Sequence, residues 1–200
     1  MSRHSTSPDG FIPPHGGYEG LASYQKALIV FDATRYFCRR FLARGDRTWD
    51  QMVQAARSGK QNIVEGSKVS GASKKLELNL TSVARASLEE LLEDYRDFMR
   101  GRGIAEWGHA HPCTRRMREL NRQPNAGYET FRRAIEHPDA AVCVNAIAGL
   151  VKLTNYLLDR QIRSIEKAFL ENGGLSEAMT RARLARRARG ERRDGRDESS

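Results

Sequence analysis

The segment from Gln51 to Tyr95 constrains the fold most strongly, because its apolar residues recur at helical spacing on both sides of a glycine-containing turn. Gly66 and Gly71 interrupt the pattern, and Ser73 is expected to start the next helix. The segment therefore predicts two amphipathic helices joined by a turn near Gly66–Ser73. Their apolar faces carry Trp49, Met52, Val53, Ala56, Ile63 and Val64 in the first helix, and Leu76, Leu80, Val83, Leu91 and Tyr95 in the second.

The remainder of the chain is helical in pattern as well. An earlier helix stops at Gly45, which suits the left-handed position after a helix C-terminus, and Asp46 or Thr48 is placed to cap the next helix. A long helix resumes at Asp139 and runs to a pair of glycines. Since no segment reads as a strand, we predict an all-α protein, an up-down-up-down four-helix bundle. Small residues in its second helix, Ala55, Ala56, Ser58 and Gly59, favour close approach of another helix.

Changes in composition divide the chain into three parts. Residues 1–20 are rich in Gly, Pro, Ser and His and are expected to form a flexible arm. Residues 21–174 form the bundle, with an insertion at about 104–138 before the last helix. Residues 175–200 are expected to be a basic, partly disordered suffix. Within the insertion, short helices are predicted at Arg115–Leu120 and Tyr128–Glu136.

The charge balance favours an anionic partner. The net charge is +9, charged residues make up 30% of the chain, and only 39% is hydrophobic, which does not suit a large enzyme core. Nucleic acid is one such partner; ordinary solubility is the alternative explanation of the charge. A membrane surface is disfavoured in the tail, because Leu184 is its one strongly apolar side chain among the arginines.

Basic residues cluster near the end of the first helix, along the second, at the start of the third and in the tail. Such side chains grip phosphates without reading sequence, and the alternative is a solvated surface. The candidate nucleic-acid-binding residues are Arg35, Arg39, Arg40, Arg44, Arg47, Arg57, Lys60, Lys68, Lys74, Lys75, Arg181, Arg183, Arg186, Arg187 and Arg189.

Catalytic and metal-binding constellations are weak in this sequence. His109, His111 and Cys113 are zinc-type ligands, but no second cluster completes a set of four, so an exposed loop is favoured. No pair of titratable groups stands out for acid–base chemistry. Three widely spaced cysteines do not indicate a disulfide framework and fit a reducing cytoplasm. We expect no cofactor, no metal and no enzymatic activity.

Two segments carry a resemblance to a known family. QAARSGKQNIVEG resembles the segment ending in N-I-A-E-G of a bacterial four-helix-bundle family, and Ala86–Leu91 is similar to its small-Ser-Leu-x-Glu-Leu stretch. That family includes proteins encoded in 23S rRNA intervening sequences and the accessory variability determinant of diversity-generating retroelements. Trp107, Tyr156–Gln161 and Phe169–Leu175 resemble a branch described as the four-helix-bundle suffix domain. The motif positions are Asn62, Glu65, Gly66, Ser87 and Glu90.

The resemblance implies a homopentamer of four-helix bundles around a central channel, with nucleic-acid binding through basic surfaces. In retroelement members it implies assistance to a reverse transcriptase. The chain departs from the family pattern in Ile63-Val64 before Glu65, in the insertion and in the basic tail. For Glu65, a structural role at a helix end is favoured over ligand or subunit contact.

Together these features predict a non-enzymatic, cytoplasmic, nucleic-acid-binding oligomeric bundle that acts through phosphate-backbone electrostatics. RNA is favoured over DNA as the partner, and no membrane is expected. The alternative is a structural or scaffolding oligomer that recruits a protein partner such as a reverse transcriptase.

Overall fold

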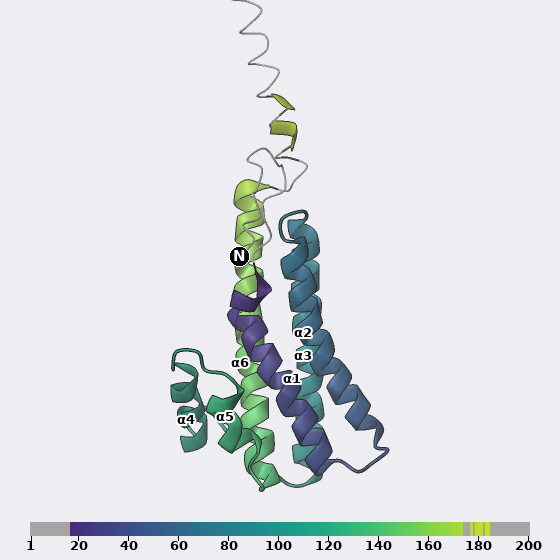
Figure 1. The fold of residues 1–200 in the computed structure, drawn as a ribbon, viewed down its shortest axis with the longest axis vertical. Coiled ribbons are helices and arrows are strands. Elements are labelled where there is room, and N and C mark those ends of the chain that lie inside the picture. The colour runs from purple at the N-terminus through teal and green to yellow at the C-terminus, as the bar shows by residue number, and fades with distance from the viewer. Residues whose placement is uncertain (1–16, 174–176, 178, 182, 185–200) are drawn as a thin grey trace, which may run out of the picture.

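A computed structural model describes residues 17–173, 177, 179–181 and 183–184, and it is all-helical there, as predicted. No strand occurs in these ranges. The helices form a tall, narrow body (Figure 1). Their bounds are η1 Tyr18–Gly20, α1 Ala22–Phe41, α2 Arg47–Val69, α3 Lys74–Gly101, α4 Pro112–Asn121, α5 Tyr128–Ile135 and α6 Ala140–Asn172.

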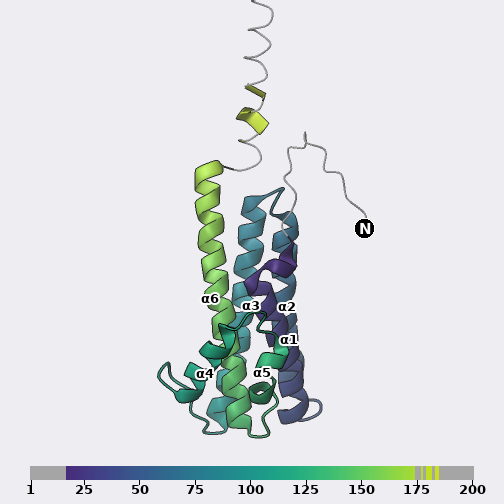
Figure 2. The same ribbon diagram turned by 60° about the vertical axis from the view of Figure 1, so that its left-hand side comes forward.

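The four long helices pack against one another side by side (Figures 1 and 2). The contact between α2 and α3 is the most extensive, and α1 contacts both α2 and α6, while α6 also contacts α3. The short helices α4 and α5 lie beside one end of this body, against α6 and α1.

Polar side chains cap the first turns of three of the long helices. The Asp46 carboxylate accepts a hydrogen bond from the Thr48 amide at 2.9 Å, and the Ser73 hydroxyl accepts one from the Leu76 amide at 3.2 Å. Asp139 caps α6 in the same way. These bonds satisfy backbone donors that have no partner inside the helix.

Two predicted helix ends need correction. The first helix ends at Phe41, ahead of Gly45, which takes a positive φ of 84° in the following turn. Gly66 does not break the second helix, which continues to Val69. A β-carbon at Gly66 would lie 3.5 Å from the Glu77 carbonyl oxygen, so α3 packs against this glycine at ordinary contact distance and the position is not a turn.

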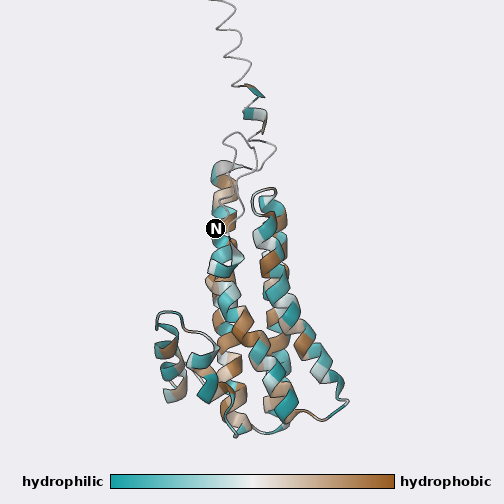
Figure 3. Cartoon of the chain, viewed as in Figure 1, coloured by the Kyte–Doolittle hydropathy of each residue, from teal (hydrophilic) through white to brown (hydrophobic). Residues whose placement is uncertain are grey.

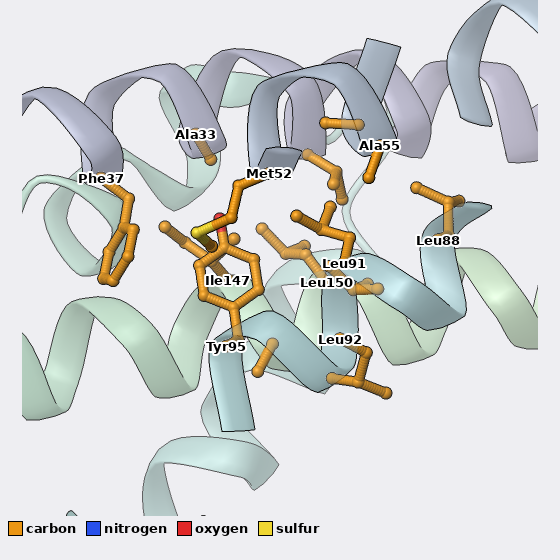
Figure 4. Packing of buried hydrophobic residues seen from close by; sticks show 14 of the residues in the cluster. Ala33, Phe37, Met52, Ala55, Leu88, Leu91, Leu92, Tyr95, Ile147 and Leu150 are labelled. Atoms are coloured by element: carbon orange, nitrogen blue, oxygen red, sulfur yellow. The ribbon is translucent and has the colours of Figure 1, made fainter. Parts of the chain in front are cut away.

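The core lies between the long helices, and hydrophobic and hydrophilic residues alternate along each of them (Figure 3). Phe37, Met52 and Tyr95 are fully buried within it, beside side chains of α6 such as Ile147 (Figure 4). The Tyr95 hydroxyl donates to the Thr34 hydroxyl at 2.8 Å, which gives a buried polar group the partner it requires. All four long helices therefore contribute side chains to one level of the core.

Small residues allow α2 and α3 to approach closely, as predicted. A β-carbon at Gly59 would lie 2.7 Å from Leu88, and the hydroxyls of Ser58 and Ser87 are 3.1 Å apart. The Asn62 amide donates to the Ser58 carbonyl oxygen at 2.9 Å. We call these contacts the α2–α3 seam.

The insertion folds as two short helices, as expected. Phe131 of α5 is buried, whereas α4 contributes no buried residue. The Lys26 ammonium of α1 donates to the Ala126 carbonyl oxygen at 2.7 Å, and burial lowers the pKa of this lysine. On the other side, Asn145 of α6 accepts a hydrogen bond from the Trp107 amide at 2.7 Å. These polar contacts hold the insertion to α1 and α6.

The helix α6 is the one described helix that is long and apolar enough to cross a membrane by length and composition. Of its most apolar window, 61% is buried inside the protein. Val144, Ile147, Leu150 and Leu158 all face the shared core. The apolar composition of α6 is therefore that of a helix buried in the centre of a bundle.

Candidate nucleic-acid interface

The helices α1 and α2 carry most of the candidate cations. Residues 22–69 contain nine basic and four acidic residues, a balance of +5. Six of the seven candidate cations between Arg35 and Lys60 are exposed and Lys60 is half-buried. We call this set the α1–α2 basic surface: Arg35, Arg39, Arg40, Arg44, Arg47, Arg57 and Lys60.

In the described part of the chain, the cations of this surface have no carboxylate partners. Among the described residues, no side chain of α1, α2 or the turn between them forms an ion pair. By contrast, Arg85, Arg96 and Arg100 of α3 are each paired with a carboxylate. The charge of the α1–α2 basic surface is therefore available to an external anion.

Arg35 and Lys60 meet over one aromatic ring. The Lys60 ammonium lies 4.5 Å from the centroid of the Phe31 ring, and the Arg35 guanidinium lies 5.7 Å from it. The ring attracts each cation, but the two like charges repel each other. An anion between them would relieve that repulsion. We call this arrangement the Phe31 cluster, and it joins α1 to α2.

The spacing of Phe31 and Arg35, four residues apart in one helix, was visible in the sequence. In the sequence, Phe31 reads as one of the apolar residues that recur along the first helix. The approach of Lys60 from α2 depends on the register between two helices, and no sequence pattern indicated it.

Further cations gather at one end of the long helices. Arg39 and Arg40 lie in the last turn of α1, Arg44 lies in the connection, and Arg47 opens α2. Two cations in a last turn interact favourably with the helix dipole, which is a structural role open to Arg39 and Arg40. The Arg40 guanidinium also lies 5.5 Å from the centre of the Phe41 ring.

Lys68, Lys74 and Lys75 lie apart from this surface. Lys68 is in the last turn of α2, about 30 Å along the helix axis from Arg47 at 1.5 Å per residue. Lys74 forms an ion pair at 2.8 Å with Glu77, a residue that is only 8% exposed. The structure thus gives Lys74 a partner of its own, and the predicted cations do not form one continuous patch.

Only two of the five arginines predicted as contacts in the tail lie among the described residues. Arg181 and Arg183 are helical and exposed. Arg186, Arg187 and Arg189 lie outside the described residues.

The five motif positions divide between packing and surface. Asn62 and Ser87 both bond to Ser58 in the α2–α3 seam, and Gly66 packs against α3. Glu65 and Glu90 are exposed. The role predicted for Glu65 at a helix end does not apply, because α2 continues past it to Val69.

The loop that carries His109, His111 and Cys113 is organised around Trp107 and α4. The His111 ring stacks on the Trp107 ring, with centroids 4.7 Å apart, and its Nδ1 accepts a hydrogen bond from the Cys113 amide. His109 bonds to Arg118. Among the described residues, no three His, Cys, Asp or Glu side chains gather in a metal-binding arrangement.

The three cysteines occupy different surroundings. Cys38 and Cys143 are buried and Cys113 is exposed. Burial raises the pKa of Cys38 and of Cys143 to about 12, so neither is a thiolate near neutral pH. These two cysteines act as small apolar side chains in the core.

The chain matches no known protein family, no curated protein and no solved structure in these comparisons.

Proposed function

We propose that this protein is a non-enzymatic, cytoplasmic, nucleic-acid-binding oligomer, an accessory protein that associates with RNA or DNA through phosphate-backbone electrostatics. The observation that carries the proposal is the α1–α2 basic surface, whose cations have no carboxylate partner among the described residues and whose Arg35 and Lys60 share the Phe31 ring. RNA is the favoured partner, on the resemblance to proteins encoded in rRNA intervening sequences.

The scaffold in this proposal is an up-down-up-down four-helix bundle of α1, α2, α3 and α6, with α4 and α5 inserted before the last helix. The pairing of α2 with α3 supports it: Gly59 lies at Leu88, and Gly66, further along α2, lies at Thr81, earlier in α3. These two helices are therefore antiparallel. Short connections between neighbouring antiparallel helices are typical of such bundles.

Phosphates suit this surface for physical reasons. A guanidinium presents paired donors that match the oxygens of a phosphate, and an ammonium adds a compact charge. Contacts of this kind release counterions, so the affinity falls steeply as salt rises and depends little on base sequence. A rigid helix pair would present the cations at fixed spacing.

Self-association is supported by an apolar stripe on α3. Leu76 is 44% exposed and Val83 is 48% exposed, and the two lie seven residues apart, on the same side of the helix. Apolar side chains in such a row are suited to contact with another chain. A homo-oligomer, and a pentamer in particular from the family resemblance, is the proposed assembly.

The same stripe favours a second candidate function. In this alternative the oligomer is a scaffold that recruits a protein partner, for instance a reverse transcriptase, and the basic surface serves solubility. A scaffold of that kind would show no affinity for nucleic acid, even at low salt.

Titrating the purified chain into labelled RNA and DNA separates the two functions. The partners would be a short RNA duplex, the same duplex in DNA and a single strand of RNA, each measured by fluorescence anisotropy over a salt series. We expect binding to all three, tighter for RNA and weakening steeply with salt. No binding at low salt would overturn the proposal and favour the scaffold.

Light scattering on the same sample tests the assembly. A mass corresponding to several copies is the expected result, and a monomer at working concentration would contradict the proposed oligomer.

A further inference from the structure

The outward face of α6 carries a row of cations around one tyrosine. Lys152, Tyr156, Arg160, Arg163 and Lys167 follow one another at steps of four, four, three and four residues. At 100° per residue, these positions fall within an arc of about 80° on the helix. Leu158 and Ile165, on the opposite side, are buried in the bundle. The row, which we call the α6 outward face, therefore points away from the core.

Tyr156 is unlike the other five tyrosines of the chain. Tyr18 packs edge-on against Tyr24, and the hydroxyls of Tyr36, Tyr95 and Tyr128 each donate a hydrogen bond. Tyr156 is 58% exposed, and among the described residues no aromatic ring or cation stacks on its ring and none bonds its hydroxyl. Packing within the protein therefore does not account for an aromatic side chain at this outward position.

Arg160 and Arg163 follow the tyrosine on the same face and have no carboxylate partners among the described residues. Three other pairs use neighbouring charges of α6: Lys152 with Glu106, Asp159 with Arg85 at 2.5 Å, and Lys167 with Glu171 at 3.7 Å. The two arginines thus keep their charge beside an open ring.

We infer that the α6 outward face binds single-stranded nucleic acid, with a base stacked on Tyr156 and phosphates held by Arg160 and Arg163. The inference rests on the proposed function and adds a second contact surface to it. An exposed aromatic ring flanked by cations is the combination that single strands require, since every base has a flat face to stack and each linkage carries a charge.

A single strand is favoured over a duplex by the position of the ring. In a duplex the bases stack on one another and their flat faces are covered, whereas an unpaired base can stack on an aromatic side chain. Arg163 lies about 10 Å along the helix axis from Tyr156, at 1.5 Å per residue. A strand that stacks a base on the ring can therefore place its neighbouring phosphates beside the arginines.

The test compares single-stranded RNA with duplex RNA on the full chain and two variants of the tyrosine. Tyr156→Ala removes the ring, and Tyr156→Phe keeps it. We expect Tyr156→Ala to weaken single-strand binding about tenfold, within the range known for base–aromatic stacking, and to leave duplex binding unchanged. Tyr156→Phe should bind both as the wild type does. Because the ring is exposed, thermal melts of both variants should match the wild type.

The arginines have a separate signature. Replacing Arg160 and Arg163 with glutamine should lower the slope of log affinity against log salt for the single strand by about 1.4, at about 0.7 for each phosphate contact. An unchanged slope would remove the arginines from the site.

Other outcomes decide against the inference. Equal affinities of Tyr156→Ala and the wild type for the single strand would overturn it while leaving the proposed function in place. Equal losses for duplex and single strand would also overturn it, because a duplex has no free base face to stack. No binding of either RNA by the wild type would overturn both the inference and the proposed function.

Discussion

The α1–α2 pair and the α3–α6 pair belong to one bundle but use their charges in opposite ways. Residues 22–69 carry nine basic and four acidic residues, none of them in an ion pair among the described residues. The helix α3 carries five basic and six acidic residues, a balance of −1. Its Arg85 pairs with Asp159 of α6, and Arg96 and Lys152 both pair with Glu106. Three arginines of α3 are thus neutralised within the protein, whereas the cations of the α1–α2 basic surface are presented to solvent.

This difference separates two uses of basic residues that composition alone cannot distinguish. Exposed ion pairs contribute about 0–1 kcal/mol each, so the α3–α6 pairs add modestly to packing. Unpaired cations contribute no such ion-pair stabilisation. Their repulsion lowers the stability of the isolated protein and raises its attraction for an anion. The net charge of +9 therefore does not show that the positive charge is concentrated on α1 and α2.

The largest expected effect comes from neutralising one set of cations and sparing the other. Replacing Arg35, Arg57 and Lys60 with glutamine should weaken RNA binding about 100-fold at low salt, since each residue removes a phosphate contact. The matched control replaces Arg85, Arg96 and Arg100 with glutamine, which changes the net charge equally.

The control should lose at most about threefold in affinity, because these arginines are occupied by carboxylates. Anisotropy titrations of both triple variants make the measurement. Equal losses in the two variants would show that only the total charge matters, and the comparison between the helix pairs would fail.

A smaller effect is expected at the seam that joins the two helix pairs. Gly59→Ala places a methyl group 2.7 Å from the buried Leu88, and we expect a net loss of about 1 kcal/mol in the free energy of unfolding. Denaturant unfolding measures it. Gly149→Ala is the matched control within α6.

A β-carbon at Gly149 meets nothing within 4 Å, so alanine should raise stability by about 0.5–1 kcal/mol through helix propensity. A gain at both glycines would contradict the close α2–α3 contact.

The smallest expected effect concerns Glu106, which links α3 to α6 through the insertion. Burial alone would raise the pKa of this carboxyl, but Lys152 and Arg96 together hold it below its ordinary value. A lowered pKa stabilises the fold above the unfolded value of about 4.3, and this stability is lost as pH falls through the folded value.

Because Glu106 is partly exposed, we expect the wild type to exceed Glu106→Gln by about 0.5 kcal/mol at neutral pH. The difference should vanish in acid, as followed by thermal melts from neutral pH down. A difference that stays constant with pH would show that the carboxylate charge is not what links the helices.

The sequence predicted the helical class, the two short helices of the insertion, Asp46 as one of two candidate caps, and helix starts at Ser73 and Asp139, because these depend on local spacing and local backbone bonds. Gly66 was misjudged as a break. A glycine in a helix interior looks the same in sequence whether it ends the helix or admits a neighbour. Only the packing of α3 against it distinguishes the two.

The candidate site was only partly predictable for a related reason. The basic residues were visible, but which of them are neutralised depends on contacts between distant segments, such as Arg85 with Asp159. The Phe31 cluster depends on the register of α1 against α2 in the same way. The α6 outward face was readable in principle, because its residues recur at helical spacing within a single helix.

The dependence of affinity on salt tests the central claim most directly. For a short RNA duplex, the slope of log affinity against log salt should shrink by about 0.9 for each phosphate contact removed. We predict that the Arg35, Arg57 and Lys60 triple variant loses about 2–3 units of slope on that scale, while the Arg85, Arg96 and Arg100 control keeps the slope of the wild type. Equal slopes for the wild type and both variants would contradict the assignment of phosphate contacts to the α1–α2 basic surface.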